Sequence, residues 1–286
     1  MSTTSSSQTL AQRVLPRIHR VLLYAFAAVF VFAFGFPIYW MMVSSITPLE
    51  QVISYPPSFV PLEMTFENYE RLLSDTSFAQ WMFNSLVVSF GNIALSITVS
   101  ILAGYGLTRF HLPYKKHLAY IFLFAYMFAP VMLGVPYFMI FHQYGLLNTY
   151  PGIILAHSSV TIPFTIWLMW QFFQTVPIEL EESAWIYGAP RWKSMLEVAI
   201  PSAAPGIVAA AIFAFGISWS DYTFALILIS DPSMQMMTVG IANFTTGAEI
   251  FWDLIMASIT LLVIPPLLII FFLNKYILKG FSVSGM

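Results

Sequence analysis

The sequence predicts an all-α integral membrane protein with six transmembrane helices, and three observations lead to this fold class. Of the 286 residues, 59% are apolar and 8% are charged, whereas a soluble domain has about 45–50% apolar and about 25% charged residues. Mean hydropathy is correspondingly high, at +0.80. The chain also contains six apolar runs of roughly 20 residues, the helix length that crosses a bilayer core of about 30 Å.

The composition excludes several classes of protein. A soluble enzyme needs more surface charge and a disordered chain needs fewer apolar residues. A nucleic-acid-binding protein needs a basic face, whereas the formal net charge here is −2. The sequence has no cysteine, so disulfides, thiolate zinc sites and a cysteine nucleophile are also excluded. We therefore expect membrane lipid, and no nucleic acid, among the partners.

The six apolar runs are the predicted membrane helices. Proline interrupts the third and fourth runs at Pro130, Pro136 and Pro163. Because a proline in a membrane helix frees a carbonyl group that only protein or water can satisfy, these helices should kink where they line a protein interior. In chain order the runs are 21–43, 84–107, 118–140, 153–173, 206–229 and 251–273.

The positive charges predict the orientation, because cytoplasmic loops are enriched in Lys and Arg. With the N-terminus in the cytoplasm, ten of the 11 Lys and Arg residues lie on that side, and Arg71 lies outside. Both termini and the 174–204 loop are therefore expected to be cytoplasmic. The ten cytoplasmic residues are Arg13, Arg17, Arg20, Arg109, Lys115, Lys116, Arg191, Lys193, Lys275 and Lys279. The acids expected outside are Glu50, Glu63, Glu67, Glu70, Asp75, Asp231, Glu249 and Asp253.

The first run is too long for a cleaved signal peptide, so we interpret it as a retained anchor after a flexible Ser/Thr-rich tail, 1–10. The polar segment 47–80 is expected outside, with Phe66, Tyr69 and Leu73 on one face of a short surface helix. The predicted parts are a cytoplasmic tail (1–20), the first helix with its outer segment (21–80), a five-helix core (81–274) and a second cytoplasmic tail (275–286).

The motifs of several catalytic sites are missing from the sequence. It contains neither a G-x-x-x-x-G-K-[ST] phosphate loop nor H-E-x-x-H, so the chain is not expected to hydrolyse nucleotide by itself. The five histidines do not pair at metal-ligand spacing, and His142 and His157 are expected to be packed or interfacial imidazoles. The prediction is a non-enzymatic chain with no catalytic residue, metal or cofactor of its own.

Asp221 is the one acid well inside a predicted membrane helix, since Asp253 is placed at the outer edge of run 251–273. A charge at mid-bilayer costs about 2.5–3.5 kcal/mol on insertion scales, so such a residue normally faces a wet or paired site. Asp221 either lines a pathway or pairs two helices, or else the fifth helix starts deeper than expected or Asp221 caps a neighbouring helix; the sequence leaves these interpretations open.

Two predicted helices carry small or short polar residues at four-residue spacing. Such a stripe lets helix backbones approach closely, and it predicts packing within the subunit or against a partner. The stripes are Asn92, Ser96, Ser100 and Gly104 in one helix, and Gly206, Ala210 and Ala214 in the other.

The cytoplasmic loop 177–201 is predicted to form two short helices with a corner between them. Pro177 suits a first helical turn, and acids follow it at the positive end of the helix dipole. Gly188 is expected at the corner because glycine adopts positive φ freely. Pro190 then opens a second helix, which Pro201 ends. A loop this apolar should be covered by lipid or by a partner protein.

This loop resembles the EAA loop, E-A-A-x3-G-x9-I-x-L-P, of permease subunits in binding-protein-dependent ABC importers. Glu182, Ser183 and Ala184 are followed at matching spacing by Gly188 and by VAIP at 198–201. Ser183, Tyr187 and Ile200 depart from the usual Ala, acid and Leu. Further matches to the maltose-type second permease are FNSL (83–86), AGYGLTR (103–109), GLLNT (145–149), PF (163–164), FF (172–173), PIELE (177–181), WSDY (219–222) and KYILKG (275–280).

The resemblance implies a type I ABC importer permease fold and a role as half of the pathway for a sugar, an oligosaccharide or disaccharide. It implies four kinds of partner or setting: a second permease, two ATPase subunits that bind ATP and Mg²⁺, an extracytoplasmic sugar-binding protein, and a prokaryotic cytoplasmic (inner) membrane. The residues expected in ATPase coupling are Glu181, Glu182, Ser183, Ala184, Gly188 and Pro201. The candidate pathway-lining residues are Asp221, Trp219 and Tyr222.

Other functions are weighed against this one. A permease of the same superfamily for a polyol or glycerol phosphate fits the same motifs. A secondary transporter would need inverted repeats and several midplane ionisable groups, and a membrane-embedded enzyme would need convergent His, Asp or Glu residues. Asp221 is the one residue that meets either requirement.

Overall fold

The computed structural model describes residues 5–56, 58–61, 63–245 and 250–283, and in these ranges all regular secondary structure is helical. The chain divides into two compact units, one of residues 1–71 and 251–260 and the other of residues 72–250 and 261–286. Some residues used above to predict orientation lie outside the described part: Glu249, and the side chains of Arg13, Arg17, Lys275 and Lys279.

Four of the described helices are long and apolar enough to cross a membrane, and six candidate spans result if each of two bent pairs is one span. The four are α1 (Ser5–Ser45, apolar over Leu22–Ser45), α4 (Phe78–Arg109), α7 (Tyr150–Thr175) and α14 (Trp252–Val283, apolar over Trp252–Leu273). The bent pairs are α5 (Lys115–Tyr126) with α6 (Pro130–Gln143), at 89°, and 191–202 with α11 (Ala204–Trp219), at 75°.

The first unit contains α1, α2 (Leu49–Val52), most of α3 (Glu67–Ser74) and the start of α14. The Asn68 side chain donates to the carbonyls of Ser45 and Thr47, so it fastens α3 to the end of α1. Arg71 forms an ion pair of 2.7 Å with the buried Asp253. The short helix predicted in segment 47–80 is thus present as α3, held by polar contacts.

Helices extend into both predicted tails. Helix α1 begins at Ser5, so the expectation of a flexible tail over 1–10 is wrong from that residue on. The segment between Gln8 and Arg20 is rich in Leu, Gln and Arg, which favour helix and extend the apolar helix toward its N-terminus. Helix α14 likewise continues to Val283, through most of the tail predicted at 275–286.

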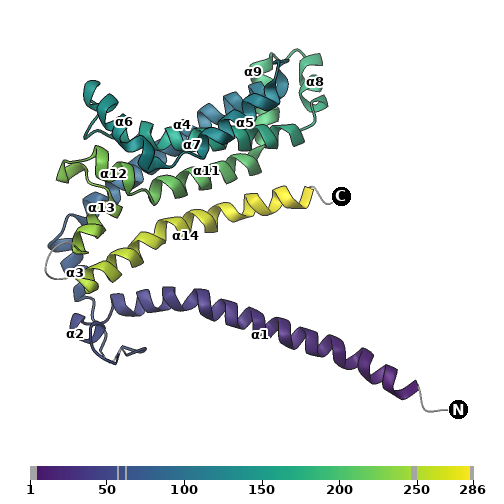
Figure 1. The fold of residues 1–286 in the computed structure, drawn as a ribbon. Helices are drawn as coiled ribbons and strands as arrows, with labels where there is room; N and C mark the ends of the chain where they lie inside the picture. Colours follow the sequence, from purple (N-terminus) through teal and green to yellow (C-terminus); the bar gives the residue numbers. More distant parts are fainter. Residues whose placement is uncertain (1–4, 57, 62, 246–249, 284–286) are drawn as a thin grey trace. The chain divides into compact units, whose positions relative to one another are not determined.

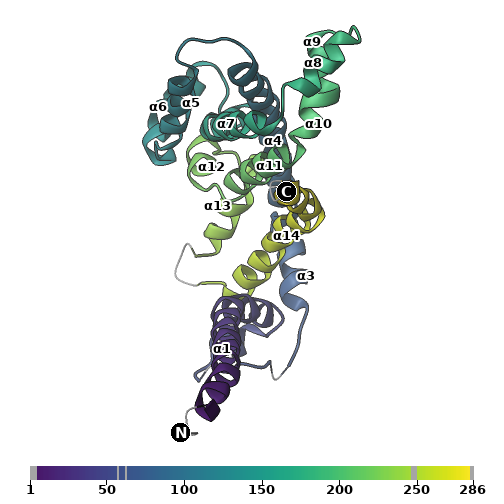
Figure 2. The same ribbon diagram turned by 90° about the vertical axis from the view of Figure 1, so that its right-hand side faces the viewer.

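In the second unit, α4 packs along both α7 and α11, α5 packs on α7, and α6 packs on α12 (Thr223–Leu228). Figure 1 shows α4, α7 and α11 running side by side, and Figure 2 shows the α5–α6 pair beside α7. The remaining elements are α8 (Glu179–Ile186), α9 (Arg191–Ser194), a π-helical turn (Met195–Ala199), α10 (Ile200–Ser202), a 3-10 turn (Pro232–Met234), α13 (Met237–Ala242) and a second 3-10 turn (Asn243–Thr245).

Two predicted continuous helices are broken in the structure. The run 118–140 is interrupted at 127–129, because Pro130 is the first residue of α6 and the residue before a proline favours extended backbone (Ala129, ψ 135°). The run 206–229 is interrupted at 220–222, between α11 and α12. Pro136 and Pro163 lie inside α6 and α7 without ending either helix.

The small-residue stripes pack within the subunit. All seven of their residues are buried. A Cβ atom on Gly104 would lie 2.8 Å from Cβ of Met169 in α7, and one on Gly206 would lie 2.3 Å from the Phe172 ring. Glycine is therefore required at both positions for the close approach of the helices.

Asn92 joins α4, α7 and α11 at the middle of this packing. Its Oδ1 accepts hydrogen bonds from Ser96, Ser158 and Thr161, and its Nδ2 donates to the Ala214 carbonyl at 2.9 Å. Each of these polar side chains is buried. Because no water is available in an apolar core, their polar groups must satisfy one another.

Replacing Asn92 with alanine is expected to destabilise the folded chain by about 2 kcal/mol, since membrane hydrogen bonds average about 0.6 kcal/mol each. The melting temperature in detergent should fall by several degrees. Thr98→Ala on the same helix is the control, because the exposed Thr98 hydroxyl bonds only to the Ala94 carbonyl of its own helix among the described residues. Equal melting temperatures for the two variants would contradict a joining role for Asn92.

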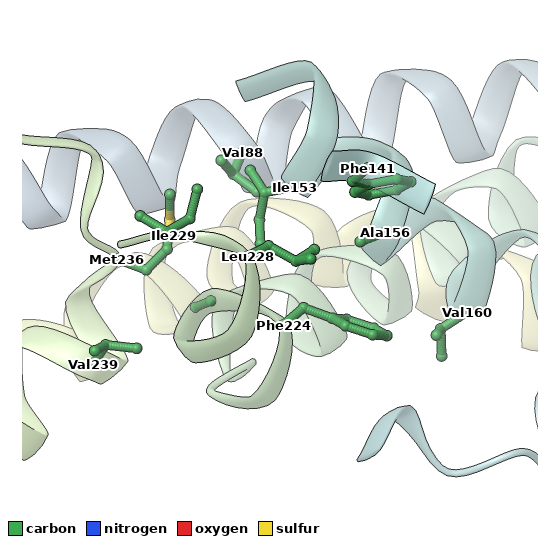
Figure 3. Packing of buried hydrophobic residues seen from close by; sticks show 11 residues of the cluster. Val88, Phe141, Ile153, Ala156, Val160, Phe224, Leu228, Ile229, Met236 and Val239 are labelled. Carbon is green, nitrogen blue, oxygen red and sulfur yellow. The ribbon is translucent and has the colours of Figure 1, made fainter. Parts of the chain in front are cut away.

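A second core lies beside the broken helix, where residues of α12 form one buried cluster with residues of α4, α6, α7 and α13 (Figure 3). Phe224 and Leu228 of α12 are almost completely buried there, together with Ile153 and Ala156 of α7. The short helix is therefore fixed by side-chain packing along its inner face.

Candidate functional site

The loop 177–201 forms the predicted pair of helices around a glycine corner. Helix α8 carries three acids in its first turn, a favourable arrangement with the helix dipole. Gly188 has φ +87°, in the left-handed region, and α9 begins directly after Pro190. The helix–corner–helix prediction is confirmed.

Pro201 does not end the second helix, as the sequence had suggested. It lies inside α10, and the chain bends at Ala203 instead. A proline ring clashes with the carbonyl four residues earlier in a regular α-helix. The π-helical turn at Met195–Ala199 widens the helix immediately before Pro201 and accommodates the ring.

Glu181 is the best-buried charged group of this loop. Its side chain is fully enclosed, and Oε1 lies 2.7 Å from Nε of Arg109, the last residue of α4. The Tyr105 hydroxyl, one turn earlier on α4, donates to Oε2 at 2.7 Å. Both carboxylate oxygens therefore have charged or polar partners, as a buried charge requires.

The same arginine also holds the end of α7. Its two terminal nitrogens donate to the Val176 carbonyl at 2.9 Å and the Phe173 carbonyl at 3.4 Å. Carbonyls at a helix C-terminus lack partners within the helix, so they are natural acceptors for arginine. Arg109 and Glu181, together with Tyr105, thus fasten three helix ends to one another; we call these three residues the anchor.

The anchor changes the interpretation of Glu181. The sequence grouped Glu181 with Glu182 and Ser183 as residues that meet a partner, yet Glu181 is inaccessible whereas Glu182 and Ser183 are exposed. Reasoning from the sequence missed Arg109 as its partner, because 72 positions separate the two residues. A basic residue at the end of a predicted helix and an acid-rich loop on the same side were the available signals.

The outer surface of the loop is apolar and open. Ile186 is 84% exposed and Tyr187 is 92% exposed, on either side of the α8 end, and Trp192 and Leu196 are also exposed. Ala184 is half-buried. Arg191 lies over the Trp185 ring at 5.3 Å, a cation–π contact across the glycine corner. An exposed apolar surface on a firmly fastened base is typical of a docking site.

A pocket lies between the end of α4 and α8. Charged groups of both signs line it, namely the basic Arg191 and the acidic Glu182, together with the His111 imidazole and the Trp185 indole. The pocket is therefore suited to charged side chains from a docked protein. Its other lining residues are Tyr105, Arg109, Phe110 and Ile178.

The three candidate pathway residues lie at the break between α11 and α12 but face different surroundings. Trp219 is buried and donates from Nε1 to the Leu262 carbonyl at 3.1 Å. Asp221 accepts from the Ala225 backbone N–H at 3.1 Å, so it caps α12. Its Oδ2 also lies 3.1 Å from Nε2 of His157 on α7. Tyr222 remains 44% exposed.

These contacts bear on the interpretations weighed for Asp221, since its carboxylate caps α12 and lies beside His157 of α7. A pathway-lining role for Asp221 stays a prediction. His157 is packed, as expected, and its ring nitrogens also contact Ser218 and Asp221. Among the described residues, no three His, Asp or Glu side chains converge as a metal site would require.

The chain is similar in sequence to known transport proteins. Residues 96–283 match the family model described as "Binding-protein-dependent transport system inner membrane component". Diacetylchitobiose uptake system permease protein NgcG of Streptomyces coelicolor is 31% identical, over 82% of this chain and 78% of that protein. Trehalose/maltose transport system permease protein MalG of Thermococcus litoralis is 28% identical, over 94% and 97%. Sulfoquinovosyl glycerol transport system permease protein SmoH of Agrobacterium fabrum is 29% identical, over 88% of each.

A solved structure supports the fold. A chain of a bacterial ABC transporter involved in the import of the acidic polysaccharide alginate superimposes with a TM-score of 0.75, covering 96% of this chain and 99% of that chain at 22% identity. At this identity the likeness bears on the fold alone, and it confirms the type I importer permease fold.

Proposed function

Since the chain belongs to the binding-protein-dependent transport system inner membrane components, and is thus a multi-pass membrane transport subunit, we propose that it forms half of the pathway of an ATP-driven sugar importer. The observation that carries the coupling part of this proposal is the anchored, apolar surface of 177–201. Because Glu181 and Arg109 fasten α8 to α4 and α7, a displacement of α8 is transmitted to these membrane helices. The exposed apolar face of the loop requires a partner.

The proposed substrate class is a carbohydrate. Three relatives are named for diacetylchitobiose, for trehalose or maltose, and for sulfoquinovosyl glycerol. All three are glycosides, which supports an oligosaccharide or disaccharide over a polyol or glycerol phosphate. Specificity for one sugar is not assigned to any residue of this chain.

The proposed partners follow from the family and, for the ATPase, also from the exposed 177–201 surface. Of two ATPase subunits, which bind ATP and Mg²⁺, one receives the 177–201 surface of this chain in the cytoplasm. A second permease completes the pathway, and an extracytoplasmic sugar-binding protein delivers the substrate. The charge distribution supports both termini in the cytoplasm of a prokaryotic cell, with the chain in its inner membrane.

The proposed coupling assigns separate tasks to the residues of the loop. Glu182, Ser183 and Ala184 meet the ATPase on the exposed face of α8. Gly188 fixes the angle between α8 and α9, and Pro201 lies where the second helix bends into α11. Glu181 transmits movement of α8 to α4 and α7 through Arg109.

The test is purification of the tagged chain in mild detergent, followed by reconstitution of whatever complex is recovered. We expect a phosphate-loop ATPase and a second permease to copurify, and the complex to hydrolyse ATP faster with its sugar-loaded binding protein. Uptake into proteoliposomes is then compared for maltose, trehalose, diacetylchitobiose and glycerol 3-phosphate. A chain that transports without an ATPase would contradict the proposal, and uptake of glycerol 3-phosphate alone would contradict the substrate class.

A further inference from the structure

His157 contacts both sides of the break between α11 and α12. Nδ1 of His157 is 2.7 Å from Oγ of Ser218, in the last turn of α11. Nε2 is 3.1 Å from Oδ2 of Asp221, which lies in the break and caps α12. One ring from α7 thus holds the end of one helix and the start of the next; we call Ser218, His157 and Asp221 the brace.

The break needs such a brace for two physical reasons. Helix α12 spans only Thr223–Leu228, and a helix this short does not hold itself together without outside contacts. The break also lies in an apolar stretch, where freed backbone groups and a carboxylate are costly to leave unpaired. Nε2 of His157 lies close to the carboxylate on one side, and the Ala225 N–H donates to it from the other.

The brace is buried, but the helix that it orients is partly exposed. The His157 and Ser218 side chains are shielded (2% and 6% exposed), and Phe224 packs beside the imidazole. By contrast Tyr222, directly before α12, and Leu226, four residues later on α12, expose 44% and 51% of their surface. The contacts of the brace therefore act together with the packing of Phe224 and Leu228 to orient this exposed face.

Other contacts hold the rest of α12 and leave the brace as the polar connection to α7. The Thr238 hydroxyl donates to the Asp221 carbonyl from α13, and the Asn148 N–H donates to the Leu228 carbonyl at 3.1 Å. Beyond the C-terminus of α12, the Ser233 hydroxyl and backbone N–H donate to the Asp231 carboxylate and hold the pKa of that carboxyl below its ordinary value.

We infer that His157 is a positioning residue of transport, which holds the α11–α12 break at a set angle through Ser218 and Asp221 and so orients the exposed Tyr222–Leu226 face. This inference goes beyond the proposed function and uses its transport assay as the readout. It assigns no contact between His157 and sugar. Substitution of His157 is expected to lower the amount of sugar taken up per ATP hydrolysed.

The test compares His157→Ala, Asp221→Ala, the double variant and His157→Gln in the reconstituted complex. We expect about a tenfold loss of uptake for each alanine variant, a typical coupling effect, with ATP hydrolysis within about twofold of wild type. The double variant should lose less than the two single losses combined, because both substitutions remove the same His157–Asp221 contact. His157→Gln should keep more uptake than His157→Ala, since an amide can both donate and accept. Exposed His142 on α6, replaced by alanine, is the control.

A second measurement does not depend on transport. The chain has no cysteine, so Leu226→Cys gives a single labelling site on the exposed face. In detergent, His157→Ala should change its rate of maleimide labelling, whereas His142→Ala should leave the rate unchanged. Unchanged labelling, additive losses in the double variant, or uptake equal to that of His142→Ala would overturn the inference. Failure of the wild-type complex to transport any sugar would instead count against the proposed function.

Discussion

Replacing Glu181 with alanine is expected to destabilise the chain and abolish coupled uptake, whereas replacing Glu182 is expected to affect only coupling. Removing Glu181 leaves Arg109 buried without its charge partner, and breaking a buried pair in this way costs about 3–5 kcal/mol. Arg109 is only 8% exposed, so water cannot take the place of the carboxylate. The melting temperature of the isolated chain should fall together with uptake.

Three glutamates in the first turn of α8 make this a controlled comparison. Glu182→Ala should leave the melting temperature unchanged but weaken recovery of the ATPase, because its side chain is exposed. Glu179→Ala, also exposed, is the control for the loss of an acid near the helix start. Combining Arg109→Ala with Glu181→Ala should restore part of the stability, since no unpaired charge then remains. A melting temperature for Glu181→Ala equal to that of Glu179→Ala would contradict the anchor.

The overall fold could be predicted from the sequence because its signals are local. Runs of apolar residues are visible in 20-residue windows, and the glycine corner at 188 follows from short-range turn chemistry. The breaks in two helices were harder to predict from the sequence. Pro130 breaks one helix by a local rule. At the break 220–222, however, Asp221 caps α12 through the Ala225 N–H and lies beside His157, a contact between residues far apart in the sequence.

The candidate site was predictable as a segment but not in the roles of its residues. The pattern around 182–201 located the loop, yet the spacing alone could not distinguish the buried Glu181 from the exposed Glu182. Burial there is decided by Arg109 and Tyr105, which come from a helix far away in the sequence. Trp219 shows the same difficulty, since its indole N–H donates to the Leu262 carbonyl rather than facing outward.

Replacing Gly188 with aspartate is expected to leave membrane insertion intact and abolish coupled uptake. A Cβ atom at this position would meet no atom within 4 Å, so the effect does not come from a clash within the chain. It comes instead from a new charge beside the exposed apolar surface formed by Ile186 and Tyr187, where a desolvated charge opposes docking. Wild-type uptake by this variant, at normal expression, would contradict the coupling role.

Two further substitutions separate the shape of the corner from its charge. Gly188 has φ +87°, a conformation that asparagine tolerates and that β-branched valine strongly resists. Gly188→Asn should therefore keep most uptake, while Gly188→Val should lose it by forcing the corner to change its angle. If valine and asparagine behave alike and only aspartate fails, charge at the docking surface decides coupling. If valine fails with aspartate, the angle that Gly188 sets between α8 and α9 is itself required.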